Sequence, residues 1–414
     1  MVNRLEQEKL NIHDRLLEQM DLSSDLTDAE IAEIIEQAVL ARGRDVYLSI
    51  GEKRALKKEL FNALRKLDVL SELLEDEDIS EIMVNGQNHI FIEKKGELTR
   101  ASVSFSSEER LRNVIQQIVS SCNRIVNETV PIVDARLTDG SRVNVVLPPV
   151  ALDGAVMTIR KFPREFFTME KLIDMGSITM QAAEFLKRLV GARYNIFVSG
   201  GTGSGKTTFL NILSSYIHST ERVITIEDSA ELQIKGVPNL VRLETRNANV
   251  EGENAISMSQ LIKAALRMRP DRIIVGEVRD AAAMDMVNSM LTGHDGSLST
   301  GHGNSSKEMM LRLETMILMG YDMPVLAIRQ QLAAAIDIVV HLGRLRDNSR
   351  HVLEISEVIG VENGEIKMQT LFQFKEYREE QGRVIGALEQ TGQLINTQKL
   401  LQSGWKEEDL ERES

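Results

Sequence analysis

The chain has 414 residues, which suggests two or three domains, and its hydrophobic fraction of 42% supplies enough apolar side chains to exclude wholesale disorder. The 62 acidic residues outnumber the 49 basic ones, and the resulting formal charge of −13 repels phosphate backbones. General nucleic-acid binding is therefore disfavoured, while a local basic channel stays open as an alternative.

The cysteine content, the N-terminus and the apolar runs bear on the cellular compartment. Cys122 is the single cysteine, so an intramolecular disulfide and a cysteine-based zinc site are excluded and a reducing compartment is indicated. Residues 1–20 are charged throughout and lack the apolar core of an export signal. No uncharged run reaches the length of about 18 residues that spans a bilayer. We therefore expect a cytoplasmic protein.

Residues 1–70 are predicted to form an N-terminal helical extension, a small bundle of amphipathic helices. Apolar residues recur there at helical spacing, and Ile31, Ile35 and Val39 share one predicted face. Two pairs have the spacing of a capping box, namely Thr27 with Glu30 and Ser49 with Glu52.

From residue 71 the apolar period changes, which predicts an α+β N-domain over residues 71–162. Asn85-Gly86 between apolar residues is typical of a hairpin turn, and a helix is expected to begin near Ser106. Further strands are expected over 132–137, 143–147 and 156–160. Residues 163–176, which contain a proline and few periodic positions, are expected to be a linker.

Residues 177–376 alternate apolar strands, glycine-rich loops and helices, the pattern of a doubly wound α/β sheet. The expected strands cover 195–199, 223–226, 241–243, 273–275 and 336–340. A hairpin around Asn363-Gly364 closes the domain, and residues 377–414 are expected to form a loosely held polar tail.

A glycine-rich loop follows the first of these strands and precedes a helix. It reads Gly200-Gly201-Thr202-Gly203-Ser204-Gly205-Lys206-Thr207-Thr208 and contains the complete pattern G-x-x-x-x-G-K-[ST]. Backbone N–H groups and the helix N-terminus supply positive potential for a nucleotide β-phosphate. Lys206 is expected to meet the β and γ oxygens, and Thr207 to ligate Mg²⁺. The alternative is a surface turn rich in glycine and serine.

Acidic residues follow two of the apolar strands. Glu277 ends the stretch that begins at Arg272, where a Walker B residue would hold Mg²⁺, although aspartate is commoner at that place. Another strand ends in Glu227, Asp228 and Glu231. Any of these three carboxylates would be able to position an attacking water, and the alternative is a solvated turn.

Two histidines, His294 and His302, lie eight residues apart in a polar, glycine-rich segment after a strand. They are candidates for sensing the γ-phosphate. Zinc binding is disfavoured because no third ligand with suitable spacing is evident. Ordinary surface histidines are the alternative.

These segments resemble, in family order, the four sequence boxes of type II/IV secretion and type IV pilus ATPases. The Walker A box is the glycine-rich loop, the Asp box is 226–232, the Walker B box is 266–279, and the His box contains the paired histidines. Through residues 81–86 and 134–144 the chain is most similar to the CpaF branch, which serves Tad pili. The resemblance covers 78–374 and implies a RecA-like P-loop ATPase domain.

The resemblance also implies roles for individual residues. Glu277 would hold Mg²⁺ with support from Asp228, and Glu231 would polarise the attacking water. His294 and His302 would face the γ-phosphate of ATP.

The same resemblance implies a homohexameric ring with nucleotide between N-domain and P-loop domain. Arginines of the N-domain would then reach the phosphates, and the candidates are Arg136, Arg142 and Arg160. Each arginine has the alternative of a simple ion pair with a carboxylate. The implied partners are pilus or secretion platform proteins of the inner membrane, at whose cytoplasmic face the motor would work, with membrane contact only through them.

The chain departs from related motors in two ways. Ser229 stands where pilus extension and retraction motors commonly have proline, and the tetracysteine zinc element of some branches is absent. Two other classes of function stay open from the residues. One is a nucleic-acid translocase, which needs a basic channel with aromatic side chains, and the other is a scaffold that binds ATP without turnover.

Overall fold

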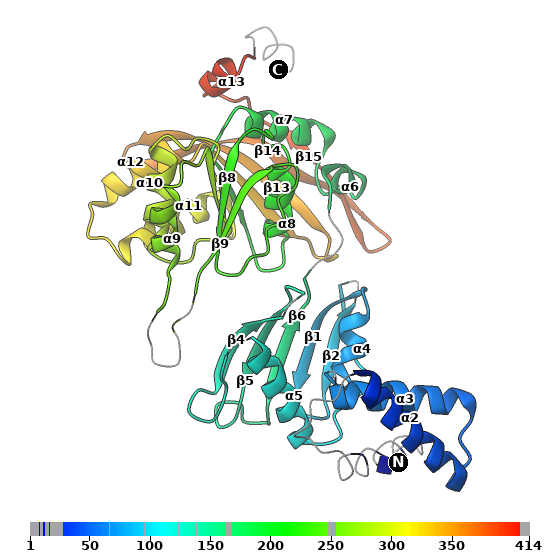
Figure 1. The fold of residues 1–414 in the computed structure, drawn as a ribbon. Coiled ribbons are helices and arrows are strands. Elements are labelled where there is room, and N and C mark those ends of the chain that lie inside the picture. The colour runs from blue at the N-terminus through cyan, green and yellow to red at the C-terminus, as the bar shows by residue number, and fades with distance from the viewer. Residues whose placement is uncertain are drawn as a thin grey trace. The chain divides into compact units, whose positions relative to one another are not determined.

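The computed structural model describes residues 28–405 except 66, 95, 123, 138, 163–166, 247 and 249–253, together with residues 8, 11, 12 and 16. The predicted capping residue Thr27 lies outside the described residues. The chain divides into two compact units, Met1–Glu165 and Phe166–Ser414, and Figure 1 draws the elements of each. No helix among the described residues is long and apolar enough to cross a membrane.

Two helices of the first unit pack together, α2 (Asp28–Asp45) and α3 (Ile50–Arg65). Their buried contact is made by the apolar faces expected from the helical spacing, because residues four apart lie on one side of a helix. The contact includes Ile31, Ile35, Val39, Leu56 and Leu60. The predicted capping box before α3 is confirmed, since Ser49 N donates to the Glu52 carboxylate and Glu52 N to the Ser49 hydroxyl.

The rest of the first unit is a six-stranded antiparallel sheet in the order β3-β2-β1-β6-β5-β4. Helices α4 (Leu70–Glu75) and α5 (Glu108–Ser121) share its apolar core. Ser107 caps α5 by accepting from Arg110 N. The strands are β1 (Ile79–Asn85), β2 (Ile90–Lys94), β3 (Glu97–Arg100), β4 (Ile132–Arg136), β5 (Arg142–Val146) and β6 (Val156–Arg160).

The second unit is built on a nine-stranded sheet in the order β15-β14-β13-β12-β7-β11-β10-β8-β9. The pairs from β12 to β9 are parallel, and β13, β14 and β15 add antiparallel strands at one side. The parallel strands are β7 (Ile196–Gly200), β8 (Arg222–Glu227), β9 (Asn239–Glu244), β10 (Arg272–Val275), β11 (Leu298–His302) and β12 (Ile338–Arg344). The others are β13 (Arg350–Glu362), β14 (Glu365–Glu380) and β15 (Arg383–Gln390).

Helices cover both faces of this sheet and bury a separate core on each. One core contains residues of α6 (Met169–Asp174), α7 (Met180–Gly191), α8 (Lys206–Ser214) and α13 (Gln398–Gln402). The other contains residues of α9 (Met258–Ala265), α10 (Ala282–Leu291), α11 (Ser306–Leu318) and α12 (Val325–Ala335), which Figure 1 shows grouped on one side of the strands. The doubly wound architecture expected from the sequence is present.

Three segments differ from the sequence-based expectation. Strand β11 was expected to be a polar loop, and it is a central strand that pairs with β7 on one side and with β10 on the other. Helix α6 lies within the expected linker, and its Met169 belongs to the core. Residues 377–380 and 383–390, expected to be a loose tail, form the end of β14 and all of β15.

Candidate active site

The glycine-rich loop joins the end of β7 to α8 and requires its glycines. A Cβ at Gly200 would lie 2.5 Å from Ser204 Oγ and 2.6 Å from the Leu342 oxygen. Gly203 and Gly205 have φ of +71° and +94°, a left-handed conformation that favours glycine. The loop thereby brings successive N–H groups to the N-terminus of α8, a geometry that binds phosphate.

Lys206 is buried at the first position of α8. Its Nζ donates to the Gly200 and Gly201 carbonyl oxygens at 3.1 and 2.9 Å and lies 3.2 Å from His302 Nδ1. An ammonium can only donate, so Nδ1 accepts and the ring proton of a neutral His302 lies on Nε2. Burial lowers the pKa of His302, and the positive charge of Lys206 lowers it further against the opposing effect of Glu277. The ring is therefore neutral at neutral pH.

Glu277 follows β10 at the same edge of the sheet. Its Oε1 lies 2.9 Å from His302 Nε2, the nitrogen that carries the proton, and its Oε2 accepts from Arg279 at 2.8 Å. The parallel strands bring these groups together, because His302 pairs with Gly200 in the β11–β7 ladder. Lys206, His302 and Glu277 thus form a continuous series of polar contacts from the glycine-rich loop to the Walker B position.

The acids after β8 are not equivalent. Glu227 is buried, and its Oε2 accepts from the backbone N–H groups of Glu231 and Leu232 at 2.7 and 2.8 Å. Burial raises the pKa of Glu227, and those backbone bonds oppose the rise. Its side chain crosses the end of β10, where a Cβ at Gly276 would lie 2.8 Å from Glu227 Cγ. Glu227 therefore shapes the turn that carries Glu231. The sequence alone did not distinguish this structural role of Glu227 from the roles expected for Asp228 and Glu231.

Asp228 and Glu231 occupy the turn that Glu227 supports. Asp228 is exposed and lies 3.4 Å from Thr245 Oγ1, whereas Glu231 is half-buried. Both residues follow the carboxyl end of β8, because that strand ends at Glu227, and β8 lies beside β10 in the sheet. Their chemical roles stay predictions, as do those of Thr207 and Thr208, which lie half-buried in the first turn of α8.

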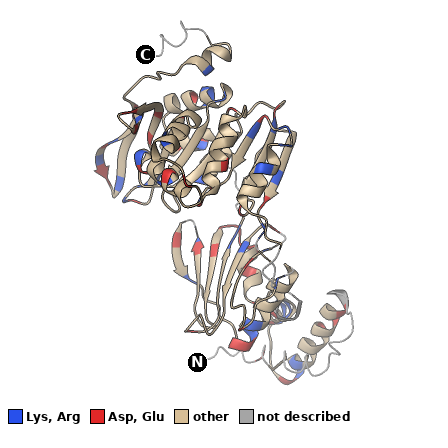
Figure 2. Cartoon of the chain, turned by 90° about the vertical axis from the view of Figure 1, so that its left-hand side faces the viewer, with Lys and Arg blue, Asp and Glu red and all other residues tan. Residues whose placement is uncertain are grey.

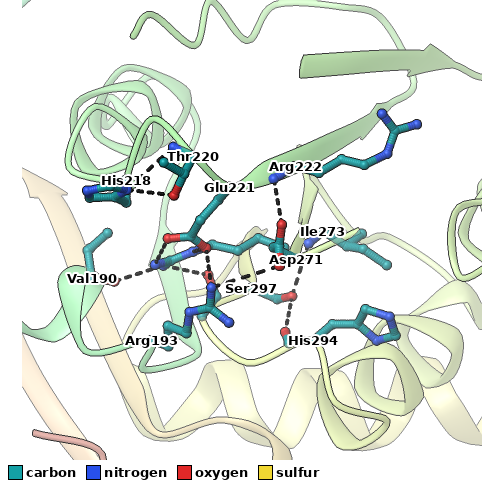
Figure 3. Close-up of polar contacts among 12 residues, drawn as sticks. Val190, Arg193, His218, Thr220, Glu221, Arg222, Asp271, Ile273, His294 and Ser297 are labelled. Atoms are coloured by element: carbon teal, nitrogen blue, oxygen red, sulfur yellow. Dashed lines mark hydrogen bonds and ion pairs between the residues drawn. The ribbon is translucent and has the colours of Figure 1, made fainter. Parts of the chain in front are cut away.

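The structure separates the two histidines that were expected to face one phosphate. His302 ends β11, whereas His294 precedes that strand and lies at its amino end, so the length of the strand, roughly 13 Å for four rises of 3.3 Å, separates the two edges. His294 Nδ1 lies 3.2 Å from the Ser289 oxygen, and the His294 oxygen accepts from Ser297 Oγ. Figure 3 shows it near Ser297 and Ile273, with Arg193 and Glu221. The structure therefore does not bring His294 to the phosphate loop together with His302, because the strand direction puts it at the opposite edge, and its role at the γ-phosphate stays a prediction.

The three candidate arginines of the first unit lie in one row. Arg136 pairs directly with Arg142 in the β4–β5 ladder, and Arg142 pairs with Arg160 in the β5–β6 ladder. Directly opposed residues of an antiparallel sheet project to the same face. The opposite face carries the core residues Val143 and Ile159, so the arginines lie on the side away from the core. Sequence spacing had suggested the residues without showing that they form a row.

A central parallel sheet with a phosphate-binding loop and acids after neighbouring strands defines a P-loop nucleotide-binding domain of the doubly wound class. The chain belongs to the Type II/IV secretion system protein family, whose model matches residues 63–394. The sequence-based prediction of a P-loop ATPase agrees with this membership.

Relatives and one solved structure agree with the family. A putative conjugal transfer protein of Mycobacterium tuberculosis is 34% identical over 325 residues, which cover 77% of this chain and 90% of the relative. The type IV secretion system protein PtlH of Bordetella pertussis is 32% identical over 302 residues, covering 67% and 89%. The crystal structure of the Yersinia pseudotuberculosis ATPase DotB matches with a TM-score of 0.50 at 18% identity, covering 70% of this chain and 77% of that one, and it supports the fold.

Proposed function

We propose that this protein is a Mg²⁺-dependent ATPase that powers a type IV secretion or pilus machine. The observation that carries the proposal is the contact series from Lys206 through His302 to Glu277, because it connects the phosphate-binding loop with the metal-binding position. A surface turn rich in glycine and serine would not bury its lysine or place it against a histidine of the neighbouring strand.

The oxygen groups around the loop fit Mg²⁺. Thr207 offers a hydroxyl, and Glu277 and Asp228 offer carboxylates, all hard ligands of the kind that Mg²⁺ takes in small number beside phosphates and water. When bound, the ion would neutralise charge on the β and γ oxygens. Glu231 would orient the attacking water from the turn that Glu227 holds. The Lys206 ammonium would bind the β and γ oxygens, and His302 would respond when the phosphate draws Lys206 away.

The arginine row of the first unit supports a second part of the proposal. Arg136, Arg142 and Arg160 would stabilise the charge of the transferred phosphoryl group when the N-domain closes on a nucleotide. We propose that this occurs in a homohexameric ring and that hydrolysis turns the N-domain relative to the P-loop domain.

The machine we propose is a Tad or related type IV pilus of the CpaF type. The support is the resemblance of the N-domain motifs, together with relatives named as conjugal transfer and type IV secretion proteins. The motor would work at the cytoplasmic face of the inner membrane against platform proteins. Acidic and basic residues are mixed along both units in Figure 2, and no stable nucleic-acid partner is proposed.

The test is steady-state phosphate release with Mg²⁺ and ATP, measured across size-exclusion fractions of the wild-type chain and of Lys206→Ala. The proposal expects activity confined to a hexamer-sized peak and lost in the variant. Tight ATP binding without turnover in any fraction would favour the scaffold instead, and retained turnover in Lys206→Ala would remove the loop from the active site.

The arginine row has its own prediction. Arg142→Ala and Arg160→Ala should each lower the rate of phosphate release by about 10³-fold or more if the arginine contacts the transferred group. Circular dichroism should show the fold unchanged, since both side chains lie away from the core. Unaltered kinetics in both variants would leave the row without a role in hydrolysis.

A further inference from the structure

A pair of arginines lies on the other side of the glycine-rich loop from the acids. Strand β12 flanks β7 on one side, and β11, β10 and β8 lie on the other. Arg344 ends β12 and Arg350 begins β13, and the two pair directly across the antiparallel ladder. Because β12 is parallel to β7, both arginines lie at the carboxyl edge of the sheet, where the loop is.

Arg350 contacts the loop itself. Its Nε donates to the Gly203 oxygen at 2.8 Å. Its aliphatic stem lies over the start of α8, since a Cβ at Gly205 would be 3.8 Å from Arg350 Cδ. The remaining N–H groups of the guanidinium form a fork suited to phosphate oxygens.

The charge of this pair is not neutralised within the described chain. Neither Arg344 nor Arg350 forms an ion pair with a carboxylate among the described residues. Arg346, on the same turn, differs because it binds the carboxylates of Glu376 and Glu379. Both side chains are exposed, and because like charges placed directly opposite each other destabilise a ladder, an external anion between them would relieve their repulsion.

The turn that carries the pair is held firmly. Asp347 accepts from Ser349 N at 2.9 Å and from Val384 N of β15 at 2.8 Å, and Leu345 N donates to the Ser349 oxygen. Arg346 adds its bonds to Glu376 of β14. The added antiparallel strands therefore fix where Arg350 meets the loop, which lowers the entropic cost of binding a ligand there.

We propose that Arg350, with Arg344 beside it, binds the α-phosphate of the nucleotide. This inference rests on the proposed function. If Glu277 and Glu231 act on the γ-phosphate as proposed and the loop holds the β-phosphate, the α-phosphate and the nucleoside would lie on the side of the loop where β12 and β13 are. The pair thus supplies affinity common to ATP and ADP, whereas the acids and the N-domain arginines act on the γ-phosphate.

The experiment measures binding of ADP and of inorganic phosphate by calorimetry, and ATP turnover, with the full chain. Arg350→Ala should weaken ADP binding and raise the KM for ATP by the same factor of about 10 to 100, as expected for a charge-assisted hydrogen bond. The kcat and the affinity for inorganic phosphate, a single group that fits the loop at the β-phosphate position without filling the α-phosphate position, should stay within about twofold of wild type. Arg350→Lys keeps the charge without the fork and should recover part of the affinity.

Arg346→Ala is the matched control, because it removes an arginine of the same turn that is already paired, and it should leave ADP affinity unchanged. Unchanged ADP affinity in Arg350→Ala overturns the inference. An equal loss for inorganic phosphate also overturns it, since Arg350 would then only order the loop. If Lys206→Ala retains wild-type ADP affinity, the proposed function fails and the inference falls with it. If Lys206→Ala loses ADP binding while Arg350→Ala keeps it, the inference about Arg350 is overturned and the proposed function stands.

Discussion

The two edges of the nine-stranded sheet carry charged clusters of similar composition but different chemistry. At the amino edge the fully buried Arg272 binds Glu221 through two bonds of 2.8 and 2.9 Å and donates to the Val190 oxygen, while Arg193 joins Glu221 from outside (Figure 3). At the carboxyl edge Lys206 and Glu277 meet through His302 beside a loop of N–H groups. In the first cluster the charged groups pair with one another. In the second they lie beside the loop that is proposed to bind phosphate.

This difference teaches how a structural charge cluster is told from a functional one. Arg272 and Glu221 satisfy each other at the start of β10 and β8, so the pair sets where both strands begin. The acids proposed to act on ATP follow the other ends of those strands. Breaking the first cluster should cost stability, and breaking the second should cost turnover.

The largest expected effect belongs to the carboxyl edge. Glu231→Gln should lower the rate of ATP hydrolysis by about 10²- to 10⁴-fold while ATP binding is kept, because the amide cannot polarise water as a carboxylate does. Phosphate release and nucleotide titration measure the two quantities. Loss of binding together with rate would instead place Glu231 among the metal ligands.

The amino edge should respond through stability. Arg272→Met leaves the Glu221 carboxylate buried without its main partner and should lower the free energy of unfolding by about 3–5 kcal/mol. Urea unfolding measures the loss, and the double variant Arg272→Met with Glu221→Met should recover part of it. The rate per folded molecule should stay near wild type, and a stable variant without turnover would contradict the division between the edges.

The two histidines allow a direct comparison of the edges. His302→Asn removes the ring that lies between Lys206 and Glu277 and should lower kcat about tenfold, the loss expected for the hydrogen bond that the ring accepts from the Lys206 ammonium. His294→Asn is the matched control at the amino edge and should leave kcat unchanged. Equal losses of kcat in both variants would contradict the assignment of catalysis to the carboxyl edge and of stability to the amino edge.

The smallest expected effect concerns a buried histidine next to β7, the strand that precedes the glycine-rich loop. His341 Nδ1 lies 3.3 Å from Ser199 Oγ of β7, and burial lowers the pKa of His341 below its ordinary value. As the pH falls below about 6.5, this histidine therefore takes up a proton more readily in the unfolded chain than in the folded one. Its protonation thus lowers the free energy of unfolding at acidic pH. Replacing the histidine in His341→Gln should reduce the loss of stability between pH 7 and pH 5 by at most about 2 kcal/mol. Thermal unfolding at both values measures it, with exposed His218→Gln as the control.

Local patterns were sufficient for much of the molecule. The glycine-rich loop, the capping box at Ser49 and the hairpin turn at Asn85-Gly86 depend on neighbours in the chain, so their residues alone predict them. The order of strands and loops likewise predicted the doubly wound sheet. Strand β11 was missed because its Leu-Ser-Thr-Gly-His sequence lacks an apolar pattern, and its place between β7 and β10 depends on pairing with strands that are distant in the sequence.

Which charged residues meet was decided by the tertiary structure alone. The sequence by itself determined that a P-loop, several acids and two histidines are present. It did not determine that His302 joins Lys206 to Glu277 while His294 lies at the opposite edge, nor that Arg350 reaches Gly203 from a distant strand. These contacts depend on strand direction, order and register, which arise from long-range pairing and leave no periodic trace in the chain.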